Sequence, residues 1–134
     1  MNEEVLANLE RAQESIAVAR ELLMGDHHDF SASRSYYAVY QTINAVPRET
    51  NDPGPTGSHV RVIEWCVDWN RRRTRLNEAG SLDNQHRDLR DSLKTLLRWR
   101  READYDPWLI DRQRAEQALN FARRMFEVVR RMVE

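Results

Sequence analysis

One short stretch concentrates the residues that could do chemistry: Phe30-Ser-Ala-Ser-Arg-Ser-Tyr-Tyr-Ala-Val-Tyr40. It places an arginine, hydroxyl groups and three tyrosines on a predicted helix, where a plain core helix would carry leucines. At about 100° per residue, one face of that helix carries Ser33, Tyr37, Tyr40 and Asn44. Arg34 and Gln41 lie beside this face. We interpret the face as a place where a ligand or a partner is held.

The other side of the same helix is apolar, with Ala32, Val39 and Ile43 roughly opposite the tyrosines. Little of its surface is therefore left for water. A helix that is apolar or aromatic on most sides is buried on more than one of them, either at the centre of a bundle or in a subunit contact. We favour the subunit contact.

Together with Arg101-Glu-Ala-Asp-Tyr-Asp106 and the helix after it, the tyrosine segment resembles the small prokaryotic HEPN domain family. In that family a Ser-Arg-x-Tyr-Tyr-Ala helix precedes an Arg-x-x-Ala-Asp-Tyr segment. The resemblance covers most of the chain and is weakest between Arg48 and Asn84. It implies a helical bundle that forms a homodimer and belongs to a toxin–antitoxin or phage-defence system. It also implies RNA as target or ligand and a small nucleotidyltransferase as partner.

This chain departs from the family pattern at the catalytic motif. HEPN toxins and defence nucleases carry an arginine followed, after four to six residues, by a histidine that is proposed to act in metal-independent RNA cleavage. The histidines here are His27, His28, His59 and His86, and none follows an arginine at that distance. Relatives with the tyrosine motif have histidine where Gln41 stands, and an amide does not titrate near neutral pH. We therefore expect a catalytically silent domain.

The second motif keeps Arg101, Asp104 and Tyr105, with Asp104 where the toxin branch has its catalytic motif. A carboxylate beside arginines is ionised and paired rather than ready to accept a proton. We interpret the three residues as a structural clasp at a helix end. The weak catalytic candidates are Arg34, Arg101 and Asp104. Whether a companion nucleotidyltransferase modifies Tyr105, as happens to a tyrosine in part of the toxin branch, stays open.

The residues expected to line or brace a cleft near the dimer contact are Arg34, Tyr37, Gln41, His59, Arg98, Arg101, Asp104 and Tyr105. His59 is included because relatives tend to have histidine at the start of the third helix. His27 and His28 lack a third spaced metal ligand, and Cys66 has no partner motif, so we expect exposed turn residues and a half-buried small residue. No metal and no cofactor is expected.

Further basic residues allow two interpretations. Arg87, Arg90, Lys94, Arg98 and Arg101 form a stripe along which a phosphate backbone could lie. Asp91 and Glu102 stand at ion-pair spacing within it, which favours a solvated face. Trp65 and Trp69, near the arginine run 71–75, could stack on unpaired bases, but their helical spacing favours packing.

Length and composition suit one domain over residues 1–134. The chain has 40% hydrophobic and 32% charged residues, with four glycines and four prolines, which is typical of a helical globular protein. Its net charge is only −1, but the acidic residues gather early and the arginines later. There is no basic-then-apolar leader and no uncharged membrane-spanning stretch, so we expect a cytoplasmic protein without membrane contact.

Hydrophobic periodicity and breakers predict five helices. The expected ranges are Glu3–Met24, Phe30–Val46, Ser58–Leu76, a helix capped by Ser81 and reaching Glu102, and one capped by Asp106 with Pro107 at its first position that runs nearly to Glu134. The fourth helix should carry a leucine stripe of Leu82, Leu89, Leu93 and Leu96. The last helix should carry an apolar stripe with small residues early, which would let another helix approach closely: Ala115, Ala118, Ala122, Met125, Val129 and Met132. Residues 51–57 form a breaker-rich loop. The predicted fold is all-α, an antiparallel up-and-down bundle of four long helices and a shorter one.

The sequence thus leads to one favoured function and two alternatives. The favoured one is a catalytically silent homodimer that binds RNA, a nucleotide or a partner protein. The first alternative is a metal-independent ribonuclease toxin, and the second is a purely structural dimer. The three differ in whether RNA is cleaved, bound or ignored.

Overall fold

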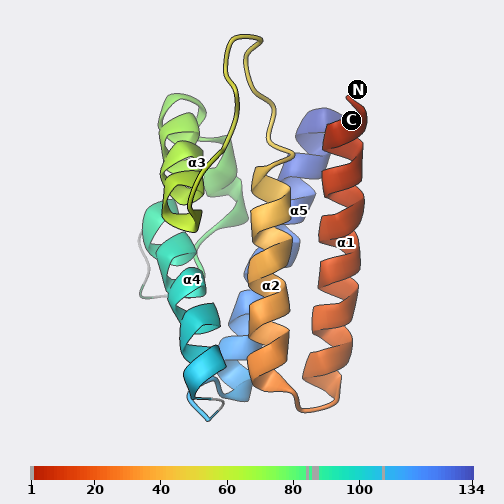
Figure 1. Ribbon diagram of the computed structural model, residues 1–134, viewed down its shortest axis with the longest axis vertical. Coiled ribbons are helices and arrows are strands. Elements are labelled where there is room, and N and C mark those ends of the chain that lie inside the picture. The colour runs from red at the N-terminus through yellow and green to blue at the C-terminus, as the bar shows by residue number, and fades with distance from the viewer. Residues whose placement is uncertain (1, 84, 86–87, 107) are drawn as a thin grey trace.

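The computed structural model describes residues 2–83, 85, 88–106 and 108–134. Within them the chain forms five α-helices and one 3-10 helix, and no strand is found among the described residues (Figure 1). The elements are α1 (Glu3–Met24), α2 (His28–Ile43), α3 (His59–Arg73), the 3-10 helix η1 (Arg75–Ala79), α4 (Leu89–Tyr105) and α5 (Arg112–Val133). The predicted all-α helical bundle is confirmed.

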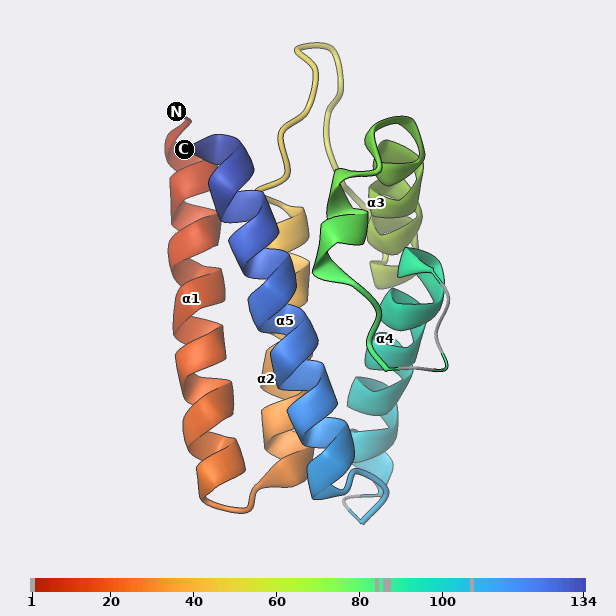
Figure 2. The same cartoon turned by 180° about the vertical axis from the view of Figure 1, so that it is seen from behind.

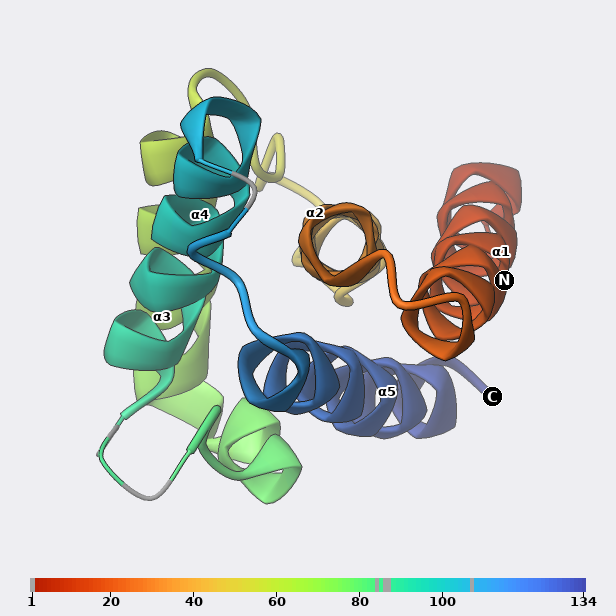
Figure 3. The ribbon, with the colours of Figure 1, turned by 90° about the horizontal axis from the view of Figure 1, so that it is seen from below.

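α2 lies at the centre of the bundle. Seen along the long axis, α1, α4 and α5 surround it (Figure 3), and its most extensive packing is against α1 and α5. From behind, α5 crosses between α1 on one side and the α3–α4 column on the other (Figure 2). The burial of α2 on several sides is therefore explained within one chain, by the central position rather than by the subunit contact that we favoured.

α1 has the predicted bounds, because its cap and its apolar stripe agree. The Asn2 side chain accepts a hydrogen bond from the Glu4 main-chain N–H at 2.7 Å, which satisfies one of the free donors at the helix start. Its inward positions are buried, with Ala12 and Ala19 both 0% exposed. α1 and α2 form an antiparallel hairpin through a turn at Gly25 and Asp26.

Two predicted helix ends are too late. The tyrosine helix ends at Ile43 instead of Val46, although Ala45 and Val46 stay buried in the turn after it. The third helix ends at Arg73, because Thr74 adopts the left-handed conformation with φ of 55°. Leu76, predicted inside that helix, is instead buried in η1.

The predicted start of the fourth helix at Ser81 is wrong. The cap is Asp88, whose carboxylate accepts from the Asp91 main-chain N–H at 2.9 Å. Leu82, predicted to begin the leucine stripe, is buried outside the helix, and its main-chain N–H donates to Ser92 Oγ at 3.0 Å. Two predictions, on His86 and Arg87, fall outside the described residues.

The predicted start of the last helix is also wrong. Asp106 ends α4, and Asp111 caps α5 by accepting from the Arg114 main-chain N–H at 2.8 Å. Pro107, predicted at the first helical position, lies outside the described residues. The small-residue stripe is confirmed, because Ala115, Ala118 and Ala122 are each 0% exposed and let neighbouring helices approach closely.

The segment between α2 and α3 rises over one end of the bundle and returns (Figure 1). Asp52 holds it, accepting from the Gly54 main-chain N–H at 2.8 Å and from Trp65 Nε1 at 3.1 Å. Trp69 is 3% exposed and donates to the Pro47 carbonyl at 2.6 Å. Both tryptophans are therefore packing residues, as their spacing predicts. Cys66 is fully buried, not half-buried as expected.

Candidate functional site

Arg100 occupies a position on α4 where the helix otherwise buries apolar side chains. Leu93 and Leu96 are each 1% exposed, Arg100 follows at steps of seven and four residues, and Ala103 continues the same stripe. A register set by leucines therefore carries a guanidinium toward α2, where the aromatic residues lie. Burying a charged group is costly unless it finds partners, so its surroundings matter.

Those surroundings are aromatic rings and a single hydroxyl. Arg100 donates from one terminal nitrogen to the Tyr37 hydroxyl at 2.6 Å. Its guanidinium carbon lies 5.0 Å from the centre of the Tyr37 ring and 6.0 Å from that of Tyr36, within range of cation–π attraction. Arg100 Nε is buried and makes no hydrogen bond to a described residue. The charge is thus held in place but not neutralised.

His59, at the start of α3, completes the cluster. Its Nδ1 is hydrogen-bonded to the Tyr36 hydroxyl at 2.7 Å, and its ring centre is 5.0 Å from that of Tyr40. Burial, and then the charges of Arg100 and Arg101, lower the pKa of His59 below its usual value. Burial raises the pKa of Tyr36, against the opposing effect of Arg100. Both side chains are therefore neutral near pH 7.

Two more arginines border this cluster. Arg34 is exposed on α2 with its guanidinium carbon 5.9 Å from the Tyr37 ring centre, and Arg101 is exposed on α4. Within the described part of the chain, no carboxylate lies within 4.0 Å of Arg34, Arg100 or Arg101, whereas many other arginines are ion-paired. We call these three residues the arginine triad. It can attract an anion.

Gln41 braces the helices rather than facing the arginines. Its side-chain amide is hydrogen-bonded to the Ser15 hydroxyl of α1 at 2.8 Å. With the amide turned so that its nitrogen donates, it also reaches the Arg11 main-chain oxygen at 3.0 Å. Gln41 therefore forms a polar tie between α1 and α2.

A groove of about 460 Å³ runs beside Gln41 between α1 and α2. Glu4, Ala7, Asn8 and Arg11 line it from α1, and Tyr37, Tyr40, Gln41 and Asn44 from α2. Tyr37 belongs both to this groove and to the arginine triad's surroundings, because its hydroxyl accepts from Arg100. The groove and the triad are therefore contiguous.

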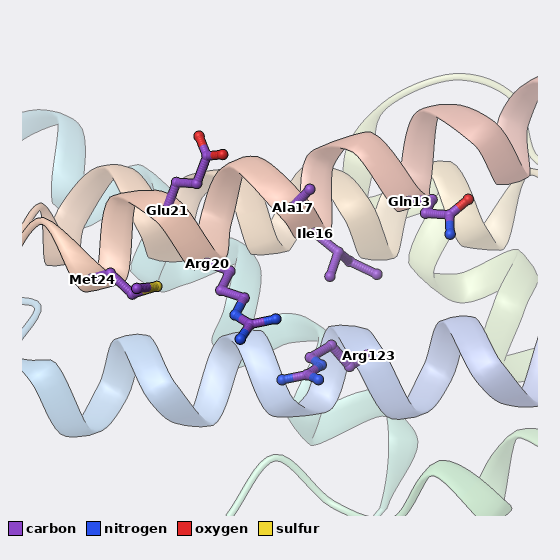
Figure 4. Close-up of a pocket in the computed structure, with 7 residues that line it drawn as sticks. All are labelled: Gln13, Ile16, Ala17, Arg20, Glu21, Met24 and Arg123. Carbon is purple, nitrogen blue, oxygen red and sulfur yellow. The ribbon is translucent and has the colours of Figure 1, made fainter.

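A second groove lies between α1 and α5 (Figure 4). Its sides carry Arg20 from α1 and Arg123 from α5, with Ile16 and Met24 beside them. Arg11 and Arg20 are nine residues apart, so at 100° per residue they point to opposite sides of α1. The two grooves are therefore independent of each other.

The remaining predicted site residues lie at the end of α4. Arg98 is exposed, with Nε 3.7 Å from a Glu102 carboxylate oxygen. Asp104 is exposed and Tyr105 is 90% exposed. No hydrogen bond or ion pair joins Arg101, Asp104 and Tyr105 to one another, so the clasp that we expected is not formed within this chain.

The basic stripe of α4 is largely neutralised. Arg90 donates to both carboxylate oxygens of Glu64 on α3, at 3.2 and 2.9 Å, and Lys94 lies 3.4 Å from the same carboxylate. The hydrogen bond from Arg90 lowers the pKa of Glu64, opposed by desolvation. Of the stripe's described residues, Arg101 alone keeps an unpaired charge, which supports the solvated-face interpretation for the rest.

The structure thus brings Arg34, Tyr37, His59 and Arg101 together and leaves Arg98, Asp104 and Tyr105 apart from them. Sequence reasoning missed Arg100 and Tyr36, which hold the cluster together. A signal for Arg100 was present, since it falls four residues after Leu96 on the predicted leucine stripe. Tyr36 was missed because it points about 100° away from Tyr37 and so lies off the predicted tyrosine face.

Among the described residues, no helix has the length and apolarity needed to cross a membrane, and no group of three or more metal-ligating side chains is present.

Comparisons with known proteins give one match. No curated protein and no solved structure matches the chain. Residues 5–132, nearly the whole chain, match the HEPN domain. The chain therefore belongs to the HEPN domain family, a family of RNA-related, toxin–antitoxin or defence proteins.

Proposed function

We propose that this chain is a single HEPN-like domain that acts as a homodimer in a toxin–antitoxin or defence system and binds RNA without cleaving it. The observation that carries the proposal is Arg100, held in a half-buried position with no carboxylate near it. An arginine placed there by the core of α4 cannot turn away into solvent as a surface arginine can. Its charge is available to a ligand.

The surroundings of Arg100 suit a phosphate group. Arg34 and Arg101 add two exposed guanidinium groups, and guanidinium forms strong, often bidentate hydrogen bonds to phosphate oxygens. Tyr37 and Tyr40 supply rings on which unpaired bases can stack. A phosphate diester with bases on either side uses both kinds of group, whereas a carboxylate ligand would use only the arginines.

The proposed partner protein is a small nucleotidyltransferase that could modify Tyr105. A small nucleotidyltransferase is the expected companion in the HEPN family, and Tyr105, 90% exposed at the end of α4, is accessible to it. Mass spectrometry of the intact chain after co-expression with a neighbouring transferase tests this. An unchanged mass would exclude modification of Tyr105.

RNA binding is tested by fluorescence anisotropy with a labelled single-stranded RNA. We expect Arg100→Gln to weaken binding by at least about tenfold, because the most fixed of the three charges is lost. Arg98→Gln is the matched control, since it removes the same charge from an exposed position of α4 that is paired with Glu102. Circular dichroism checks that both variants fold. Equal loss in the two variants would contradict a site centred on Arg100.

One observation favours a second candidate, the metal-independent ribonuclease. His59 lies beside Arg100 and Arg101 in space, although no histidine follows an arginine in the motif. If His59 Nδ1–H donates to Tyr36, its Nε2 lone pair is free to act as a general base. The 2′-hydroxyl proton would pass to Nε2, the 2′-oxygen would bond to phosphorus, and the bond to the 5′-oxygen would break as that oxygen takes a proton from water.

Incubation of labelled total RNA with the purified protein and a chelator separates the two candidates. Under the binding proposal the RNA stays intact at high protein concentration. Cleavage that His59→Asn abolishes while RNA binding persists would establish the ribonuclease instead. If RNA is neither bound nor cut, the purely structural dimer is what is left.

A further inference from the structure

We propose that the groove between α1 and α2 binds a single unpaired purine base of the RNA whose phosphate lies on the arginine triad. This inference rests on the proposed RNA binding and adds a second contact, which reads the base. The groove is the hollow lined by Asn8, Arg11, Tyr37 and Tyr40 among others, and its volume of about 460 Å³ is ample for one base.

The groove contains polar groups that the fold does not use. The Asn8 side-chain amide, half-buried on α1, makes no hydrogen bond to any described residue, and neither does the Arg11 guanidinium. Gln41 and Asn44, by contrast, are tied to Ser15 and to the Tyr40 carbonyl at 2.8 and 2.9 Å. The side chains of Asn8 and Arg11 are therefore free to recognise a ligand.

These two side chains favour purines. An asparagine amide pairs in a bidentate way with N6 and N7 of adenine, and an arginine does so with O6 and N7 of guanine. Both patterns use a base edge that pyrimidines lack. Tyr40 provides a half-buried ring whose hydroxyl makes no hydrogen bond to a described residue, and a flat base can stack against it.

The charges that line the groove suit a neutral base. Glu4, 3.9 Å from Arg48, and Arg11 both line its α1 side, so a carboxylate and a guanidinium offset each other there, whereas the arginine triad is purely cationic and attracts the phosphate. The exocyclic amino group of a base can donate to the Glu4 carboxylate. Tyr37 joins the two parts, since it lines the groove and accepts from Arg100. A nucleotide can span both without leaving the protein surface.

The experiment compares oligoadenylate with oligouridylate of equal length, which carry the same phosphates and different bases. Anisotropy is measured for the unchanged protein, for Asn8→Ala and for Gln13→Ala, an amide on the side of α1 that faces the second groove. We expect the unchanged protein and Gln13→Ala to prefer oligoadenylate, and Asn8→Ala to lose about tenfold of that preference while binding oligouridylate as before.

Two results overturn the inference in distinguishable ways. Equal binding of the two oligomers by the unchanged protein, or an equal effect of Asn8→Ala on both, excludes base reading in the groove and leaves the phosphate site standing. Absence of binding to either oligomer, with Arg100→Gln indistinguishable from the unchanged protein, removes the proposed RNA binding as well. Circular dichroism of both variants detects a folding defect in either, since Asn8 is half-buried and Gln13 is exposed on α1.

Discussion

At the scale of single residues, the feature that distinguishes this chain is a set of charged and neutral groups held in a half-buried cluster. Arg100 stays charged with a tyrosine hydroxyl as its hydrogen-bond partner, and His59 stays neutral because burial and two guanidinium groups oppose its protonation. The same cations that attract phosphate therefore keep the nearby imidazole uncharged. An anion bound beside Arg100 and Arg101 would offset their charge and make His59 easier to protonate.

The first prediction concerns the pH dependence of stability. The pKa of His59 in the folded protein lies below the unfolded value of 6.5, so at lower pH the unfolded chain binds a proton that the folded chain does not. The free energy of unfolding should therefore fall as the pH drops below 6.5. Urea denaturation at a series of pH values measures this, and the His59→Asn variant should lack that part of the decline.

NMR of the His59 ring offers an independent check. Its titration midpoint should lie below 6.5 in the free protein and move upward when a single-stranded RNA is added, because bound phosphate offsets the charges of Arg100 and Arg101. A midpoint that RNA leaves unchanged would mean that the phosphate does not lie near the arginine triad.

The second prediction concerns Cys66. Burial raises the pKa of its thiol, so the reactive thiolate is absent from the folded protein at neutral pH. A chromogenic disulfide reagent should not label native protein, and labelling should follow the unfolding transition as urea is added. Rapid labelling without urea would show that the region around α3 opens readily.

At the scale of the helices, packing decides which faces of each helix are left for function. α5 presents Ala115, Ala118 and Ala122 inward, all 0% exposed, and α2 presents Ala38 at 0%. Small residues bring the helices close together, and the polar face of α2 is then held at the surface between α1 and α4. The position of the site thus depends on close packing at its back.

The third prediction tests this close packing. Ala118→Leu adds bulk where no space exists, and overpacking of this kind costs about 1–3 kcal/mol of stability. Asn120→Leu is the control, because it adds a similar side chain at an exposed position of α5 and should change stability by about 0.5 kcal/mol or less. Urea denaturation measures both. Similar values for the two variants would show that α5 packs loosely.

At the scale of the whole molecule, the net charge of −1 gives RNA no general attraction. Many of the described cations are already paired, as Arg90 and Lys94 are with Glu64, so the charge at the site itself must decide binding. The arginine triad borders the aromatic residues, and no described carboxylate lies within 4.0 Å of it. RNA should therefore bind at the arginine triad, through a small number of ionic contacts.

The fourth prediction concerns the salt dependence of RNA binding. With single-stranded nucleic acid, each neutralised phosphate contributes about −0.7 to the slope of log K against log salt concentration. The one phosphate on the arginine triad should therefore give a slope of about −0.7, and Arg101→Ala should weaken binding with little change in that slope. Anisotropy titrations at several salt concentrations provide the slope. A much steeper slope would indicate that RNA follows a longer basic surface.

Residue patterns along the chain were enough to predict the helical class, the bounds of α1, the small-residue stripe of α5 and the family to which the chain belongs. These features depend on local periodicity and on short motifs, which involve residues close together in the sequence. The caps of α4 and α5 were misplaced because several Ser and Asp residues have capping chemistry, and only the packed chain decides which of them begins a helix.

The composition of the candidate site, by contrast, depends on how the helices pack. His59 and Arg100 are far apart in sequence, and their neighbourhood with Tyr36 and Tyr37 arises because α3 and α4 pack beside α2. Whether a charge is paired is equally a property of the fold, since Arg90 finds Glu64 on another helix while Arg100 finds no carboxylate. Spacing along a chain specifies which face a residue occupies, and packing specifies what that face meets.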